Sequence, residues 1–133
     1  MNRICMFVFL CLGSFCFADE QIKNIPAIYV SPELTGLVAE YPAAVINGYI
    51  FIDNINQAER FFRPIPPDIN LQKENVIIFA WNGSSVDKID HEKDENNMHH
   101  FVLKRGKAND LYEHVKIYAI NKEEEFLFHR VLE

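Results

Sequence analysis

Apolar residues change their spacing in the first half of the chain, and this change predicts a strand followed by a short helix. The run Tyr49–Ile52 is continuously apolar, as in a buried strand, and it stops at Asp53. Asp53 or Asn54 can cap a helix that runs to about Phe62, because short polar side chains accept hydrogen bonds from the free N–H groups of a first turn. Pro64, Pro66 and Pro67 end the helix. Its expected apolar face comprises Ile55, Ala58, Phe61 and Phe62.

The second half of the chain is rich in β-branched and aromatic residues and predicts strands. In residues 98–105, Phe101 and Leu103 alternate with His100 and Val102, whereas 75–81 is apolar at every position after Asn75. The run 25–30 suits an edge strand, because prolines lie near both of its ends. We therefore predict an α+β fold, an antiparallel β-meander of about five strands with one short covering helix, and a small β-sandwich is the alternative. The remaining strands of the meander are expected at 85–93, 114–120 and 126–132.

The stretch 82–86 (NGSSV) raises the question of a serine nucleophile. A nucleophile elbow needs Gly-x-Ser-x-Gly between a strand and a helix, and here the second glycine is missing and no helical spacing follows. Asn-Gly between two strands is typical of a hairpin turn in which both residues need positive φ. We therefore predict a type I′ turn at Asn82 and Gly83, and expect Gly83→Val to destabilise the fold while Ser84→Ala is nearly silent. In a eukaryotic host Asn82 would also head a glycosylation sequon.

The first 18 residues have the layout of a secretory signal peptide. Arg3 precedes an apolar run from Ile4 to Ala18, and two acidic residues follow at once. The run is shorter than the roughly 20 residues of a transmembrane helix, so we expect cleavage after Ala18 and no stable membrane insertion. Residues 19–133 are then expected to form a single secreted or periplasmic α+β domain. No disulfide is expected in it, because every cysteine lies in the leader: Cys5, Cys11 and Cys16.

The acidic balance of the chain argues against nucleic acid as a partner. Of the 13 basic residues, all but Arg3 lie beyond the leader, which leaves 12 against 19 acidic residues and a net charge of −7 with neutral histidines. Such a surface repels phosphate backbones, and no basic patch with interleaved aromatic residues offsets it.

Four of the histidines in the predicted β half could carry chemistry. Adjacent strands could place His91 opposite His99 or His100, a geometry that a borderline metal accepts. No pair has a His-x-x-x-His spacing, so surface or hydrogen-bonded histidines are the simpler interpretation, and we predict no metal and no cofactor. The alternative function is a metal-dependent or acid/base enzyme that uses His91, His99, His100 and His114.

Our candidate binding site is the rim around the predicted Asn-Gly turn. Trp81 ends an apolar strand there, where it is either core or a half-exposed anchor for a partner. Asp87 and Lys88 would orient a ligand, whereas Lys88 paired with a buried Asp110 or His114 would be a structural link instead. The proposed site comprises Trp81, Asn82, Ser84, Asp87, Lys88, Asp110 and His114.

Two other surfaces are candidates for partner contact. The proline-rich segment 61–68 is either a helix stop that crosses the core or a pre-ordered loop that docks with little entropy loss. The runs 25–30 and 126–132 could pair with a strand of another chain if they form uncovered sheet edges.

The stretches FAWNGSSVDKI and DLYEHVKIYAI resemble small secreted bacterial proteins of unassigned function. Those proteins carry Phe-Ala-Trp-x-Gly-Ser-x-x-Asp-Lys and later Asp-Leu-x-x-His-Val, and the likeness covers about residues 54–120. It implies no activity. The matching positions are Phe79, Ala80, Trp81, Gly83, Ser84, Asp87 and Lys88, then Asp110, Leu111, His114 and Val115.

The sequence as a whole favours a small exported, non-enzymatic binding module. The layout of capped helix, proline loop and strands is similar to that of small secreted inhibitor-type modules, although their functional loop motifs are absent here. A protein partner or an inhibitor-like role is therefore favoured. The sequence makes no prediction of the ligand's identity or of the oligomeric state.

Overall fold

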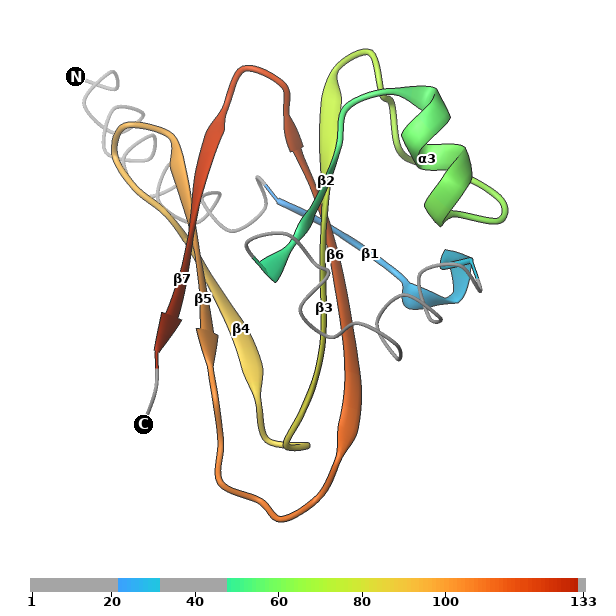
Figure 1. Ribbon diagram of the computed structural model, residues 1–133. Helices are drawn as coiled ribbons and strands as arrows, with labels where there is room; N and C mark the ends of the chain where they lie inside the picture. The colour runs from blue at the N-terminus through green and yellow to red at the C-terminus, as the bar shows by residue number, and fades with distance from the viewer. Residues whose placement is uncertain (1–21, 32–47, 132–133) are drawn as a thin grey trace, which may run out of the picture.

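The chain forms two β-sheets and one α-helix, with the helix on the outer face of the larger sheet (Figure 1). The computed structural model describes residues 22–31 and 48–131. The predicted signal peptide and its cleavage site lie outside these residues. Within the two described ranges, no helix has the length and apolar character needed to cross a membrane.

The larger sheet is antiparallel and has the strand order β1-β6-β3-β2. The smaller sheet has the order β4-β5-β7, in which β4 and β5 are antiparallel and β5 and β7 are parallel. The strands are β1 (Lys23–Ile25), β2 (Ile50–Ile52), β3 (Glu74–Gly83), β4 (Lys88–Lys93), β5 (Met98–Lys104), β6 (Tyr112–Asn121) and β7 (Glu125–Val131); the helices are the 3₁₀ turn η2 (Ala27–Tyr29) and α3 (Ile55–Phe61).

Helix α3 confirms the predicted helix and its cap. The Asn54 side chain accepts a hydrogen bond from the Gln57 backbone N–H at 3.0 Å. Ala58 and Phe61 are buried, but Ile55 is 51% exposed, so that part of the predicted apolar face is wrong. At about 100° per residue, Ile55 lies roughly 90° from the midpoint between Ala58 and Phe61, at the border of a narrow face.

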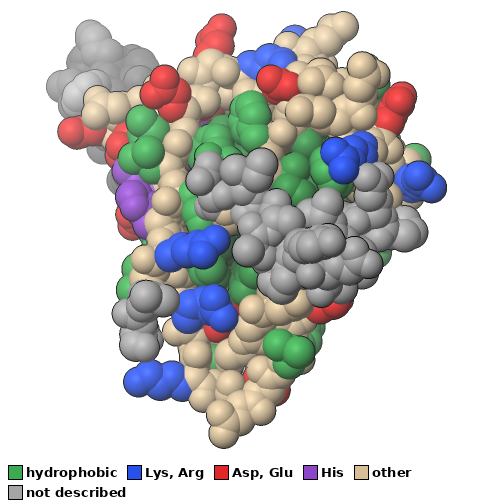
Figure 2. All heavy atoms as spheres, in the orientation of Figure 1, with side chains coloured by type: hydrophobic (Ala, Val, Ile, Leu, Met, Phe, Trp, Pro, Cys, Tyr) green, Lys and Arg blue, Asp and Glu red, His purple; other side chains and the backbone are tan. Residues whose placement is uncertain are grey.

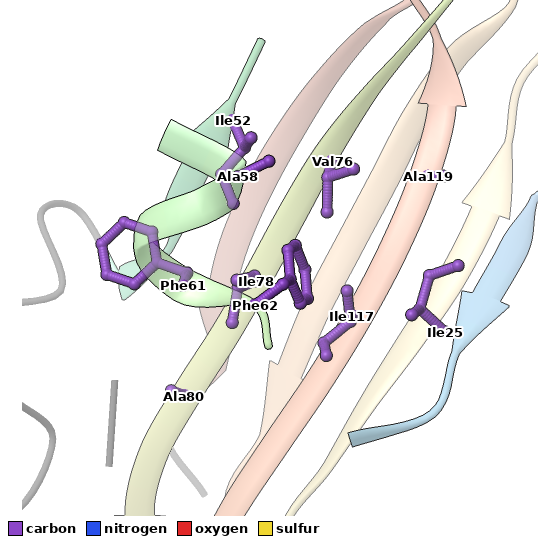
Figure 3. Packing of buried hydrophobic residues seen from close by; sticks show 10 residues of the cluster. All are labelled: Ile25, Ile52, Ala58, Phe61, Phe62, Val76, Ile78, Ala80, Ile117 and Ala119. Carbon is purple, nitrogen blue, oxygen red and sulfur yellow. The ribbon is translucent and has the colours of Figure 1, made fainter. Parts of the chain in front are cut away.

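A first core fills the space between α3 and the larger sheet. Figure 3 shows Phe62, which directly follows the helix, pointing between Ile78 of β3 and Ile117 of β6. Burying a side chain of this size contributes about 1.5–3 kcal/mol. The buried members are Ile25, Ile52, Ala58, Phe61, Phe62, Val76, Ile78, Ala80, Ile117 and Ala119.

A second core lies between the two sheets and holds them face to face. Phe79 of β3 contacts Phe101 of β5, with ring centroids 5.0 Å apart. The buried members come from both sheets: Ile77, Phe79, Trp81, Phe101, Leu103, Tyr118 and Ile120. Strands β3 and β6 therefore bury side chains on both faces, which is why residues 76–81 of β3 are all apolar rather than alternating.

The predicted strands form, but the predicted meander is wrong. Of the strands that follow one another along the chain, only β2 with β3 and β4 with β5 pair in the described residues. The doubly buried β3 and β6 pair with each other, and the chain crosses between sheets after β3, β5 and β6. This two-sheet arrangement is consistent with a helix-covered α+β fold and with a sandwich-like one.

The edge strand predicted at 25–30 is displaced toward the N-terminus. Strand β1 ends at Ile25, and the chain turns into η2 after Pro26, which has no N–H to donate to a neighbouring strand. Strand β7, the other predicted edge, does lie at the edge of the smaller sheet.

The hairpin turn predicted at Asn82 and Gly83 is wrong. Both residues belong to β3, where Gly83 is opposite Tyr112 of β6. The turn comes later, and its hydrogen bond joins the Asp87 N–H to the Ser84 carbonyl at 3.0 Å. Among the described residues only Gly48 and Asn97 have positive φ. The two-residue hairpin rule assumes that the flanking strands pair with each other, whereas β3 and β4 belong to different sheets.

Candidate functional site

Most of the predicted site residues gather at one end of the molecule, where two loops meet. The loop from β3 to β4 and the loop from β5 to β6 both lie at the lower end of the view in Figure 1. We call residues 84–88 and 105–112 the loop tip.

Asp87 connects the two loops to the larger sheet. Its side chain has no exposed surface. Oδ1 accepts a hydrogen bond from the Gly106 backbone N–H at 2.7 Å. Oδ2 accepts one from Trp81 Nε1 at 3.1 Å and contacts Arg105 Nε at 2.9 Å. One carboxylate of the β3–β4 loop thus binds strand β3 and the neighbouring β5–β6 loop.

The surroundings of Asp87 favour the ionised carboxylate. Burial alone would raise its pKa, but the hydrogen bonds from Gly106 and Trp81 and the charge of Arg105 outweigh burial and hold the pKa below the ordinary value. A general base needs a pKa near the working pH. Asp87 is therefore placed to anchor the loops and not to exchange protons at neutral pH.

Ser84 and His114 also hold the loop tip together. The Ser84 hydroxyl accepts hydrogen bonds from the N–H groups of Val86 at 3.3 Å and Ala108 at 3.1 Å. His114 Nε2 donates to the Ser84 carbonyl at 2.7 Å, and its ring stacks on Trp81 with centroids 4.5 Å apart. The imidazole meets the backbone of Ser84 and not its hydroxyl, so the pair lacks the geometry of an activated nucleophile.

The remaining predicted residues divide into one that joins this network and two that do not. Asp110 accepts a hydrogen bond from the Ser85 N–H at 3.0 Å, which ties the two loops together. Lys88 is 63% exposed and pairs with Asp90 at 3.7 Å, so the predicted link from Lys88 to Asp110 or His114 is wrong. Asn82 lies in β3, and its Oδ1 is buried without a hydrogen-bond partner in the described structure.

Three exposed hydrophobic residues at the loop tip were not among the predicted site residues. Leu111 is 82% exposed, Val86 56% and Tyr112 55%. The two segments that carry them are adjacent, because Ser85 is bonded to Asp110 and Gly83 is opposite Tyr112. For Leu111 and Tyr112 the available signal was the occurrence of large apolar residues in a segment interpreted as a turn, whereas Val86 belonged to the strand predicted at 85–93. Five of the seven predicted site residues thus form the support, and the exposed surface is formed by their neighbours. The five are Trp81, Ser84, Asp87, Asp110 and His114.

The histidines divide between three places. His91 Nε2 lies 2.8 Å from His99 Nδ1, and His99 Nε2 lies 3.0 Å from Glu124 Oε1. Burial would raise the pKa of Glu124, but the hydrogen bonds from Lys93 and His99 outweigh it and lower the pKa. An ionised Glu124 can only accept, so the His99 Nε2–H donates to it. The ring nitrogens of His91 and His99 thus point at each other. They do not converge on one point where a metal ion could bind.

The other two predicted histidines have other partners. His100 contacts Asp94 at 2.9 Å and stacks on His129 on the outer side of the smaller sheet, while His114 belongs to the loop tip. Across residues 22–31 and 48–131, no group of three or more histidine or acidic side chains is arranged to hold a metal ion.

Comparison of the chain with protein-family models, with curated proteins and with solved structures found no match. The resemblance to small secreted bacterial proteins stays a prediction from the motifs. The function is therefore argued from the geometry of the site.

Proposed function

We propose that the protein is a small exported, non-enzymatic binding module that contacts a protein partner through its loop tip. The observation that carries the proposal is the placement of three exposed hydrophobic side chains, Val86, Leu111 and Tyr112, on loops fixed by a buried carboxylate. Export rests on the signal-peptide layout of the first 18 residues.

Rigid support is what distinguishes these three residues from scattered surface hydrophobics. A partner that binds a flexible loop must offset the entropy lost on ordering it, about 0.5–1.5 kcal/mol for each immobilised side chain. Here Asp87, Ser84 and Asp110 already fix both loops through hydrogen bonds of 2.7–3.3 Å. Large apolar side chains on a rigid support, with polar groups around them, are the usual composition of a protein-binding centre.

Site-specific photo-crosslinking tests the proposal with a control of equal exposure. A benzophenone amino acid at Leu111 should give one discrete adduct with a protein of the producing organism's exported fraction, and so should the same group at Val86. The control position is Ile28 in η2, which is also 82% exposed but lies outside the loop tip. Adducts of the same masses at Ile28 and Leu111, or none at Leu111, would count against the loop tip as the contact surface.

The alternative function, an acid/base or metal-dependent enzyme, would rest on the hydrogen-bonded chain of His91, His99 and Glu124. His100 lines a surface depression together with His91 but pairs with Asp94, and His114 bonds to Ser84 in the loop tip. Titration with Zn²⁺ followed by histidine ring resonances separates the two proposals. Stoichiometric, saturable shifts of His91 and His99 would favour the enzyme, and their absence would leave the binding module as the better account.

A further inference from the structure

A small cavity opens between the two sheets, beside the loop tip. Its volume is about 130 Å³. Its apolar wall is formed by Phe79, Trp81, Ile89, Leu103 and Phe128. An apolar cavity of about 150 Å³ is known to hold benzene. The space therefore suits one compact apolar group of about that size, and it is too small for a nucleotide, a sugar chain or a long acyl chain.

Two arginines line the same cavity. Figure 2 shows Lys and Arg side chains next to hydrophobic side chains that are visible between the two sheets. Arg105 is paired with Asp87 through its Nε atom. Arg130 has no ion pair within the described part of the chain, and its guanidinium carbon lies 5.7 Å from the centre of the Phe128 ring. No acidic residue is among the described lining residues, although the protein has a formal net charge of −6.

Two further residues shape the cavity. Asn82 lines it, and the buried Oδ1 of Asn82 lacks a hydrogen-bond partner in the described residues; this oxygen accepts only, so a water molecule has to supply its donor when the ligand is a carboxylate. Gly48 also lines the cavity, and a Cβ there would lie 2.5 Å from both Arg130 Nη2 and Phe128 Cε2. The absence of a side chain at Gly48 thus leaves room for the guanidinium against the aromatic wall.

We propose that this cavity binds a small organic monocarboxylate with a compact apolar body, such as an aromatic ring. The ring lies against the apolar wall, and the carboxylate pairs with the Arg130 guanidinium, whose parallel N–H groups match a carboxylate. The proposal goes beyond the contact of the loop tip with a protein, and its test leaves Val86, Leu111 and Tyr112 unchanged.

Binding of benzoate to the purified full chain tests this assignment. Trp81 is the only tryptophan of the chain and lines the cavity, so its indole N–H resonance reports binding in a ¹H–¹⁵N spectrum. We expect benzoate to shift this resonance saturably, and benzamide, which has the same ring without the charge, to bind at least tenfold more weakly. Acetate, which lacks the ring, should also bind at least tenfold more weakly.

Substitution of the arginine provides the matched control. Arg130→Gln should weaken benzoate binding about tenfold and leave benzamide binding unchanged, whereas Arg63→Gln, at an exposed arginine outside the cavity, should change neither. Three outcomes would overturn the proposal: no saturable shift of the Trp81 resonance, equal affinity for benzoate and benzamide, or equal effects of the two substitutions. Tighter binding of a peptide ending in phenylalanine than of benzoate would overturn it in favour of a protein C-terminus.

Discussion

At the scale of single residues, the loop tip depends on Asp87, whose two oxygens together meet three donor groups. Asp87→Asn keeps the size of the side chain but replaces one acceptor oxygen by an amide that can only donate. We expect the free energy of unfolding at pH 7 to fall by about 2–3 kcal/mol, because buried donors lose their acceptor. Urea denaturation of both proteins measures the difference.

The same pair of proteins should show a characteristic dependence on pH. The pKa of Asp87 is lower in the folded chain than its ordinary value of 3.8, so the stabilisation is fully present above that value and is lost as the pH falls through the lower folded pKa. The gap between the wild type and Asp87→Asn should therefore stay constant from about pH 7 to 5 and close below about 3.8. Asp68→Asn, at an exposed position, should show almost no gap at any pH. A gap that remains open at the lowest pH would contradict the role assigned to the ionised carboxylate.

Gly83 offers a test of a corrected explanation. The sequence predicted that a side chain at this position fails because the turn needs positive φ, whereas Gly83 lies in β3 and a Cβ would collide with the Asp87 carboxylate. Gly83→Ala should therefore destabilise the protein by about 1–3 kcal/mol, the usual cost of overpacking. Asp87→Ala removes the carboxylate with which the new Cβ collides. The double variant should therefore lose less free energy of unfolding than the sum of the losses of the two single variants. Additive losses would point to backbone strain instead.

At the scale of elements, helix α3 is short and depends on its N-cap. Asn54→Ala removes the acceptor of the Gln57 N–H and should lower the free energy of unfolding by about 1 kcal/mol. Ile55→Ala changes the neighbouring residue, which is 51% exposed, and should cost clearly less. Thermal or urea unfolding of the two variants compares the costs, and equal losses would show that the cap contributes little.

The sequence predicted those features that are decided by residues near one another along the chain. The cap of α3, its end at the prolines and the buried run in β3 each follow from local spacing. Strand pairing is decided by what covers the other face of each strand. The apolar run marked β3 as buried, but no local pattern showed that β6 is its neighbour in the sheet. The hairpin predicted at Asn82 and Gly83 was wrong for the same reason. Among the described residues, the asparagine with positive φ is Asn97, in the turn between β4 and β5.

For the candidate site, too, the burial of side chains could not be predicted from the sequence. The structure brings residues about 25 positions apart together, since Ser85 bonds to Asp110 and His114 to Ser84. The burial of Ser84, Asp87 and His114 could not be predicted, because it depends on how the loops fold over the end of the sandwich-like core. Lys88 directly follows the buried Asp87, but its side chain faces solvent. This difference depends on the turn at residues 84–87, which the sequence did not predict.

At the scale of the whole molecule, strands β3 and β6 are shared by the two cores. Their even and odd positions face opposite sides, so that Ile78 packs under α3 while Phe79 packs against the smaller sheet. A disturbance of either core therefore acts on the same central strands. We expect the helix layer, the larger sheet and the smaller sheet to unfold together in one transition.

Two neighbouring substitutions test this coupling. Phe79→Ala should lower the free energy of unfolding by about 3–5 kcal/mol and Ile78→Ala by about 2–5 kcal/mol, because each leaves a cavity in a different core. Far-ultraviolet circular dichroism reports the strands and helix, and Trp81 fluorescence reports the space between the sheets. In both variants the two signals should share one midpoint, even though Ile78 faces away from Trp81. A fluorescence midpoint that shifts in Phe79→Ala while the circular dichroism midpoint does not would show instead that the smaller sheet unfolds on its own.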